Sequence, residues 1–245
     1  MLTEMLSLAP HETLTKKLFF GDLPDSPAGT LPTGIVGIDI ETEGTSLEPS
    51  SGSIGCVTFW WGSSRTCAVL SSLAKDTPNL RKYLSSASVA PIFHNYAFDA
   101  SWLVHHCGVL PQLYGDTKLV AKLLDEPATS LSALLEKYLV ADPADRPDKT
   151  VRISPWCSPY SRWTPGMREY VLNDVRHLDG LYVLLHNQLT ARQQNLYHRL
   201  VRLLPSLVEL QQSEVGSPLT NLGDLQFLTD YASRCPSKVL EKLKC

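Results

Sequence analysis

The sequence lacks the features that mark several large classes of protein. No apolar run approaches the roughly 20 residues that a membrane-spanning helix needs. The N-terminal residues show no cationic start followed by an apolar stretch, so we expect no secretory signal. The six cysteines include no CxxC pair, which argues against a zinc ribbon and against a disulfide scaffold. We therefore expect an intracellular protein with reduced thiols, in the cytoplasm or nucleoid of a cell, or phage-encoded and in the host cytoplasm.

Positive charge is also scarce. The 22 Lys and Arg residues are outnumbered by 25 Asp and Glu residues, which gives a formal net charge of −3. Proteins that coat nucleic acids by bulk attraction are usually strongly basic, so any nucleic-acid contact must be local here. With 43% hydrophobic residues, the 245 residues can bury the core of one ordinary domain with a small appendage.

The sequence divides into three parts. Residues 1–32 are rich in Pro, Gly and Ser towards their end and are expected to lead into the first strand. Residues 33–190 carry the patterns of regular strands and helices. Residues 191–245 form a helical extension, in which we expect two helices at roughly 191–213 and 221–242.

The central part predicts an α/β fold with a mixed sheet flanked by helices. Alternating or continuous apolar runs predict strands at 34–41, 53–62, 65–70 and 90–95, and helical spacing predicts helices at 97–108, 116–126, 130–139 and 165–189. The segment 141–163 is rich in Pro and aperiodic. It is long enough to be a functional loop beside a site.

Acidic residues stand at several of these predicted elements. Asp39 and Glu41 lie two residues apart on a strand, so both carboxylates point the same way. Tyr170 and Asp174 lie four residues apart, on one face of a helix. Each pair alone has an ordinary explanation, because strand ends and helix surfaces often carry such side chains.

A further acid lies at a strand-to-helix junction. Asn95 suits the N-cap of the helix that follows, and Asp99 suits its first turn, where the helix dipole favours a negative charge. Only the order of all three motifs along the chain makes a catalytic interpretation specific.

That order resembles the DEDD 3′-5′ exonucleases, in the subgroup that bears a tyrosine. DIETEG (39–44) resembles the first motif, HNYAFDASWL (94–103) the second and YVLNDVRHL (170–178) the third. The resemblance spans about residues 34–187. It implies a ribonuclease H-like core with two divalent cations, Mg²⁺ or Mn²⁺, and a catalytic set of Asp39, Glu41, Asp99, Tyr170 and Asp174.

The resemblance also implies a role for each of these residues. Asp39, Glu41 and Asp174 would bind the metal on the side of the nucleophile. Asp39 would bridge to the second metal, which Asp99 would reach mainly through water, and Tyr170 would hydrogen-bond the attacking water. Carboxylates suit this task because Mg²⁺ prefers oxygen ligands and keeps several waters.

Four residues near the motifs are candidate substrate contacts: Thr42, Leu47, Asn95 and Phe98. Asp116 matches a frequent acid of the family that is not a metal ligand. It therefore stays outside the predicted catalytic set.

The C-terminal part resembles the stretch by which family A DNA polymerases pass from the proofreading domain into the thumb (residues 196–231). We therefore predict a nuclease that removes nucleotides from single-stranded or frayed DNA 3′ ends. It would proofread for a separately encoded DNA polymerase, onto which the apolar face of the extension would dock. Two alternatives stay open: an RNase D-like exoribonuclease, and a catalytically inactive nucleic-acid-binding or scaffold protein of the same fold.

Overall fold

A computed structural model describes residues 14–25, 31–43, 48–139, 151 and 155–212, with side chains described up to residue 209. Its centre is a sheet of six strands in the order β1-β4-β3-β2-β5-β6. The strands are β1 (Thr15–Phe20), β2 (Gly34–Glu43), β3 (Ser53–Trp61), β4 (Thr66–Ser71), β5 (Val89–Phe93) and β6 (Gly115–Asp116).

The sheet is mixed, as the sequence predicts. Strands β2, β3 and β4 form an antiparallel meander, while β5 pairs parallel to β2 and β6 parallel to β5. This arrangement, with helices flanking the sheet, agrees with the mixed sheet expected from the sequence.

Strand β1 was not predicted, because it lies within residues 1–32. It pairs parallel to β4 at the sheet edge, with Lys16 opposite Cys67 and Leu18 opposite Val69. Its first three residues are polar and its last three are apolar, so the sequence shows neither the alternation of a half-buried strand nor the longer apolar run of a buried one. A short parallel strand gains its place from hydrogen bonds to a neighbour that is distant along the chain, which no local pattern reports.

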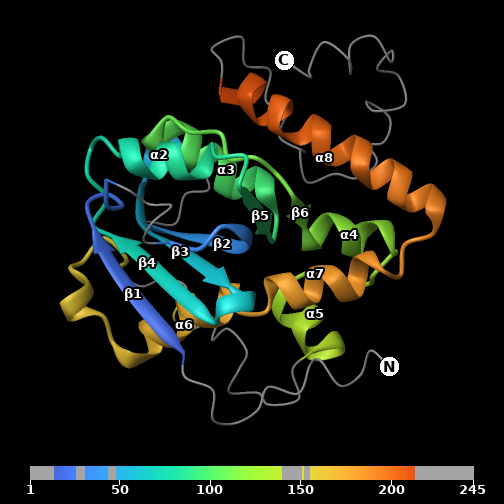
Figure 1. The fold of residues 1–245 in the computed structure, drawn as a ribbon, viewed down its shortest axis with the longest axis horizontal. Helices are drawn as coiled ribbons and strands as arrows, with labels where there is room; N and C mark the ends of the chain where they lie inside the picture. The colour runs from blue at the N-terminus through green and yellow to red at the C-terminus, as the bar shows by residue number, and fades with distance from the viewer. Residues whose placement is uncertain (1–13, 26–30, 44–47, 140–150, 152–154, 213–245) are drawn as a thin grey trace.

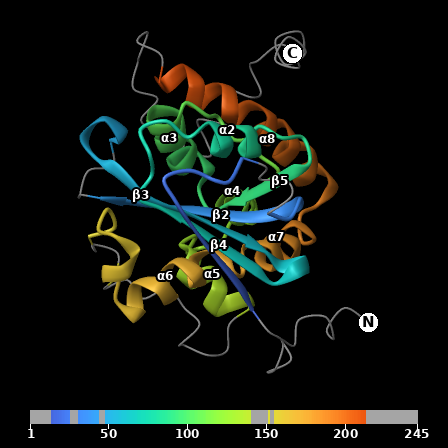
Figure 2. The ribbon, with the colours of Figure 1, turned by 60° about the vertical axis from the view of Figure 1, so that its left-hand side comes forward.

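Helices cover both faces of the sheet. Figures 1 and 2 show α2, α3 and α8 on one side and α5, α6 and α7 on the other. The α-helices are α2 (Pro78–Leu84), α3 (Tyr96–Cys107), α4 (Thr117–Leu123), α5 (Leu131–Tyr138), α6 (Pro165–Val175), α7 (Leu178–His186) and α8 (Ala191–Gln212). Short 3-10 helices are η1 (Pro49–Ser51), η2 (Gly62–Ser64) and η5 (Tyr160–Arg162).

The predicted helix 165–189 is two helices, because the chain breaks between Val175 and Leu178. No Pro or Gly marks the break, and the apolar spacing continues through it. The break lies against the sheet: a Cβ added to Gly37 would lie 2.9 Å from the carbonyl oxygen of Val175 and 3.3 Å from the Cβ of Leu178. Close packing on β2 thus separates α6 from α7.

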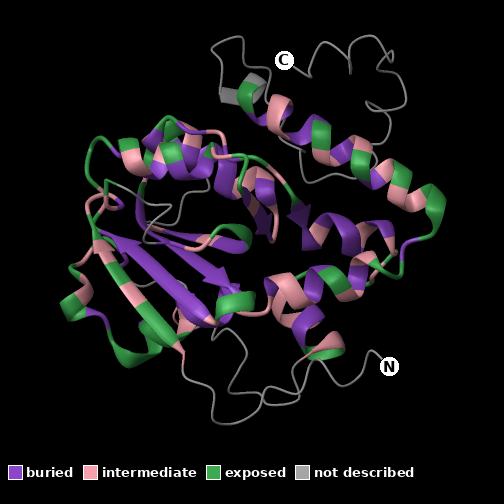
Figure 3. Cartoon of the chain, viewed as in Figure 1, coloured by how far each residue is buried: buried purple, intermediate pink, exposed green. Residues whose placement is uncertain are grey.

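Helix α8 belongs to the core rather than to an independent extension. It packs against α3 and α4 (Figure 1). The apolar face of α8 is buried, as Figure 3 shows by colour, and comprises Tyr197, Leu200, Leu203, Leu204, Leu207 and Val208. The second helix expected at 221–242 lies outside the described residues. In the part of the chain that the structure describes, no helix has the length and apolar character of a membrane span.

Candidate active site

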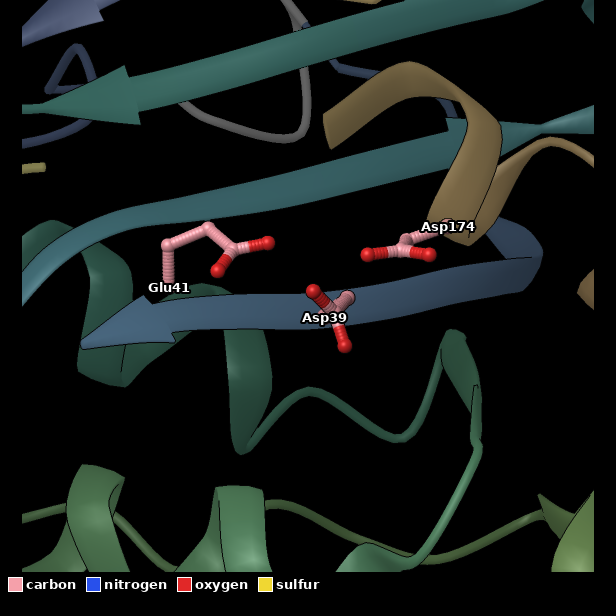
Figure 4. Close-up of side chains that lie close together, drawn as sticks. All are labelled: Asp39, Glu41 and Asp174. Carbon is pink, nitrogen blue, oxygen red and sulfur yellow. The ribbon is translucent and has the colours of Figure 1, made fainter. Parts of the chain in front are cut away.

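Three carboxylates meet above the middle of strand β2. Asp39 and Glu41 project from β2 and Asp174 approaches from the last turn of α6 (Figure 4). One oxygen from each lies within 4.8 Å of the others. The strand spacing and the helix position predicted separately from the sequence therefore converge on one point, and this cluster is a candidate site for a metal ion.

Asp99 lies beside this cluster, in the first turn of α3. Strand β2 pairs with β5 only from Gly34 to Gly37, so the next amides of β2 on that side need other acceptors. The carboxylate of Asp99 accepts one of them, the N–H of Ile40, at 3.2 Å. Asp99 thus fills the gap where β2 and β5 diverge, and this bond holds it next to Asp39 and Glu41.

The electrostatics of the cluster favour a bound cation. The pKa of Asp39 is raised well above its ordinary value, first by burial and then by the carboxylates of Glu41, Asp174 and Asp99. Burial also raises the pKa of Asp99, although its hydrogen bond from the amide of Ile40 opposes the shift. Ionising all of these buried carboxyl groups together is therefore unfavourable, because their negative charges repel one another. A bound divalent cation would offset that repulsion.

Tyr170 lies one helical turn before Asp174, as predicted from the spacing. Burial raises the pKa of its phenol, and the charges of Asp174, Glu41 and Asp39 raise it further. A hydrogen bond to Asp174 acts in the same direction. Tyr170 therefore stays a neutral hydrogen-bond donor beside the acidic cluster.

Trp156 is a residue of this site that the sequence did not single out. Its indole is fully buried and lies 5.8 Å from the ring of Tyr170, centroid to centroid, at an interplanar angle of 38°. A second tryptophan, Trp163, meets it edge-on at 5.2 Å. The ring of Tyr170 is therefore packed against a buried aromatic surface.

Trp156 is held against the sheet by Gly55 of β3. A Cβ on Gly55 would lie 2.3 Å from the Cβ of Trp156, so only glycine permits this approach. The next residue, Cys157, donates its N–H to Glu43 at the end of β2 at 2.5 Å. The predicted functional loop 141–163 thus contacts the site, although residues 140–150 and 152–154 lie outside the described part.

The cap of α3 differs from the prediction. Asn95 occupies the N-cap position, but its backbone is left-handed, with φ of 81°, and its side chain makes no cap hydrogen bond. Asp116 replaces it: its two carboxylate oxygens accept the N–H groups of Asn95 and Tyr96 and also those of Lys118 and Leu119 at the start of α4. Asp116 therefore joins two helix N-termini, which explains why a buried acid lies outside the cluster of Asp39, Glu41 and Asp174.

The other predicted substrate contacts have mixed positions. Thr42 is half-buried and follows a bulge in the β2–β3 pairing that lies directly after Glu41. Phe98 is half-buried on α3, with its ring 6.0 Å from that of Trp102. Leu47 lies outside the described residues.

Comparison with known proteins agrees with this geometry. A family model described as 3′-5′ exonuclease matches residues 30–190, more than half of the chain. The chain belongs to this exonuclease family. A comparison with curated proteins finds no match.

Solved structures of other exonucleases share the fold. Brucella melitensis NrnC is 25% identical with a TM-score of 0.67, and the match covers 84% of this chain and 100% of that one. NrnC with bound Mg²⁺ also matches at 25% identity, with a TM-score of 0.66 and the same coverage. Escherichia coli RNase D has the same fold at 16% identity and a TM-score of 0.56, over 95% of this chain and 70% of that one.

The packing of Trp156 on Tyr170 predicts a selective loss of rate in this exonuclease. Trp156→Leu should lower kcat about 10- to 100-fold with little change in KM, because Tyr170 loses the surface that orients it. Trp156→Phe should recover most of the rate. Cleavage kinetics are the measurement, and Trp61→Leu is the control, since Trp61 is equally buried but stacks on Phe59 instead. An equal loss of kcat in the control would show that Trp156 contributes only to general stability and does not orient Tyr170.

Proposed function

We propose that this exonuclease hydrolyses the last phosphodiester at the 3′ end of a single strand, using two divalent cations held by Asp39, Glu41, Asp99 and Asp174. The observation that carries the proposal is the convergence of oxygens from Asp39, Glu41 and Asp174 within 4.8 Å. The product would be a nucleoside 5′-monophosphate.

The donor set suits Mg²⁺ or Mn²⁺. All the side chains are carboxylates, which hard divalent cations prefer, and there is no thiolate or imidazole among the three clustered ligands. Bound there, the cations would lower the pKa of a water and stabilise the charge on the leaving 3′ oxygen. NrnC, which shares the fold, has been solved with bound Mg²⁺.

The protein's own groups would position the reactants. Tyr170 keeps its proton, so it can donate a hydrogen bond to the attacking water or to a phosphate oxygen. Asp99, fixed by the amide of Ile40, lies outside the group of three and would reach the second cation through water. These assignments follow the roles that the sequence motifs imply.

Single-stranded 3′ ends are the proposed substrate. Brucella melitensis NrnC was solved bound to pGG, and Trypanosoma brucei RNase D in complex with RNA U12, so proteins of this fold bind short nucleic acids. The match to NrnC covers all of that chain and 84% of this one, which favours a nuclease that acts without a polymerase. An RNase D-like activity on RNA is therefore a strong alternative to cleavage of DNA.

Proofreading beside a separate DNA polymerase is the second candidate, from the resemblance of residues 196–231. The expected docking through the apolar face of the extension does not apply to α8, because α8 buries that face on α3 and α4. Among the described residues of the extension, docking would use the exposed side of α8, which includes Arg192 and Arg202. Docking can be tested by co-elution of this protein with the polymerase in size-exclusion chromatography. A chain truncated at Gln188 would lack part of the core, so variants with reversed charge at these two arginines are better suited to the test.

The deciding experiment offers 5′-labelled single-stranded DNA and RNA of one sequence with Mg²⁺, Mn²⁺ or EDTA. We expect a ladder that shortens from the 3′ end with either metal and no cleavage in EDTA. The relative rates on the two substrates would separate the DNA and RNA alternatives. Metal-independent cleavage, or cleavage of neither substrate, would contradict the proposed function.

The raised pKa of Asp39 predicts that metal stabilises the fold. At a metal concentration about 100 times Kd, binding adds about 2.7 kcal/mol, which corresponds to a rise in Tm of about 5 to 10 °C for a chain of this size. Asp39→Asn should raise Tm in EDTA, because it removes a charge from the cluster, and should abolish most of the rise caused by Mn²⁺. Thermal unfolding with and without Mn²⁺ is the measurement. An unchanged metal response in the variant would remove Asp39 from the ligand set.

A further inference from the structure

A cavity of about 410 Å³ lies between the edge strand β1 and helix α6. Lys16 and Leu18 line it from β1, Cys67 and Val69 from β4, and Arg168 from α6. In the parallel pairing Lys16 lies opposite Cys67 and Leu18 opposite Val69, so these four side chains share one face of the sheet. The cavity therefore has a sheet floor and a helical wall.

The cavity combines three kinds of recognition chemistry. Lys16 and Arg168 supply exposed positive charge, and neither belongs to an ion pair recorded among the described residues. Leu18, 38% exposed, and the ring of Tyr160 supply an apolar and aromatic surface. Glu169 adds one carboxylate, an acceptor for hydroxyl or amino groups.

This combination matches a nucleoside monophosphate. The two cations suit a phosphate, the apolar and aromatic surface suits a base, and the carboxylate suits the hydroxyls of a sugar. A volume of about 410 Å³ lies in the range of small-ligand pockets. An inorganic anion has no apolar surface that would pack against Leu18 and Tyr160.

The cavity also adjoins the part of α6 that carries Tyr170. Arg168 and Glu169 directly precede Tyr170 on α6, and the guanidinium of Arg168 lies 5.0 Å from the centroid of the Tyr160 ring. That ring lies 4.9 Å from Trp163, which in turn packs on Trp156. Occupancy of the cavity should therefore change tryptophan fluorescence.

We propose that this cavity binds a nucleoside 5′-monophosphate unit, separately from the carboxylate cluster, with the phosphate on Lys16 and Arg168 and the base against Leu18 and Tyr160. The choice of ligand rests on the proposed function, which releases such a nucleotide. Two sources fit the same chemistry: the free product, and a nucleotide within the strand being degraded.

The test is calorimetric titration of the full chain in EDTA, where the carboxylate cluster repels phosphates. The probes are 5′-AMP, inorganic phosphate and a single-stranded oligonucleotide, with tryptophan fluorescence as a second readout. Lys16→Glu and Arg168→Glu should each weaken the binding of 5′-AMP about 10-fold or more, since each removes a charge-assisted bond to phosphate. Lys82→Glu, the same charge change at an exposed residue of α2, should have no effect.

Each outcome has a separate meaning. Binding of 5′-AMP that both cavity variants weaken identifies the free product as a ligand, and weakening of the oligonucleotide alone identifies the strand as the source. Phosphate binding as tight as that of 5′-AMP, or equal affinities in all variants, would overturn the proposal. Cleavage with Mg²⁺ is measured in parallel: a chain that cleaves normally but lacks this site contradicts only the cavity, and a chain that binds 5′-AMP without cleaving contradicts only the proposed function.

Discussion

Asp39→Ala and Asp174→Asn are each expected to reduce Mg²⁺-dependent cleavage about 1,000-fold or more while leaving the protein folded. Both side chains contribute oxygens to the candidate metal site. Water activation and charge neutralisation depend on the same ion, so losing one ligand removes several kcal/mol of transition-state stabilisation, and about 1.4 kcal/mol corresponds to each factor of ten. The measurement is the rate of shortening of a 5′-labelled strand under saturating Mg²⁺.

A matched control separates metal binding from general loss of charge. Asp125→Asn removes an exposed acid whose left-handed backbone, with φ of 56°, tolerates asparagine well. This variant should cleave at the normal rate, and circular dichroism should show all three variants folded. If the Asp39 and Asp174 variants keep near-normal Mg²⁺-dependent activity, the acidic cluster is not the metal site.

Tyr170→Phe is expected to lower the rate roughly 10- to 1,000-fold and to leave metal affinity unchanged. Only the hydroxyl is lost, because phenylalanine keeps the ring that packs on Trp156. Since Tyr170 is a neutral donor beside the carboxylates, its contribution is the position of a hydrogen bond rather than ligation. Single-turnover cleavage gives the rate, and calorimetry with Mn²⁺ gives the affinity.

Combining Tyr170→Phe with Trp156→Leu tests whether the two residues act as one unit. If Trp156 works by orienting the hydroxyl of Tyr170, its loss should cost little further rate once that hydroxyl is gone. Fully additive losses would assign Trp156 an effect of its own. Loss of Mn²⁺ binding in Tyr170→Phe would instead contradict the division between positioning and ligation.

The sequence predicted the fold class and the candidate site residues from short-range patterns and from the order of the motifs along the chain. Alternation in residues 34–41 predicted a strand that presents Asp39 and Glu41 together, and helical spacing predicted Tyr170 and Asp174 on one face. The order of the motifs indicated the exonuclease family, which the family match confirmed. The prediction of a single helix over residues 165–189 was wrong. Two helices form there, and the chain between them packs closely on Gly37, a contact that no Pro or Gly at the break indicates in the sequence.

The fate of the C-terminal part could not be read from its pattern. An amphipathic helix must bury its apolar face, but periodicity does not say against what. The structure shows that α8 packs on α3 and α4, where Tyr197 accepts a hydrogen bond from the N–H of Asp116. The sequence therefore predicted the helix, and tertiary packing decided that α8, the first part of the C-terminal segment, belongs to the nuclease core.

The sequence by itself determined which residues are candidates for metal-dependent chemistry, since the side-chain types and their spacing of two or four residues are local properties. Only the tertiary structure decided which groups support them. Trp156 reaches Tyr170 because Gly55 lets its backbone approach, and Asp116 caps two helices in place of Asn95. Such contacts join residues that are far apart along the chain. Their energies depend on packing and on satisfying buried amides, which no sequence window contains.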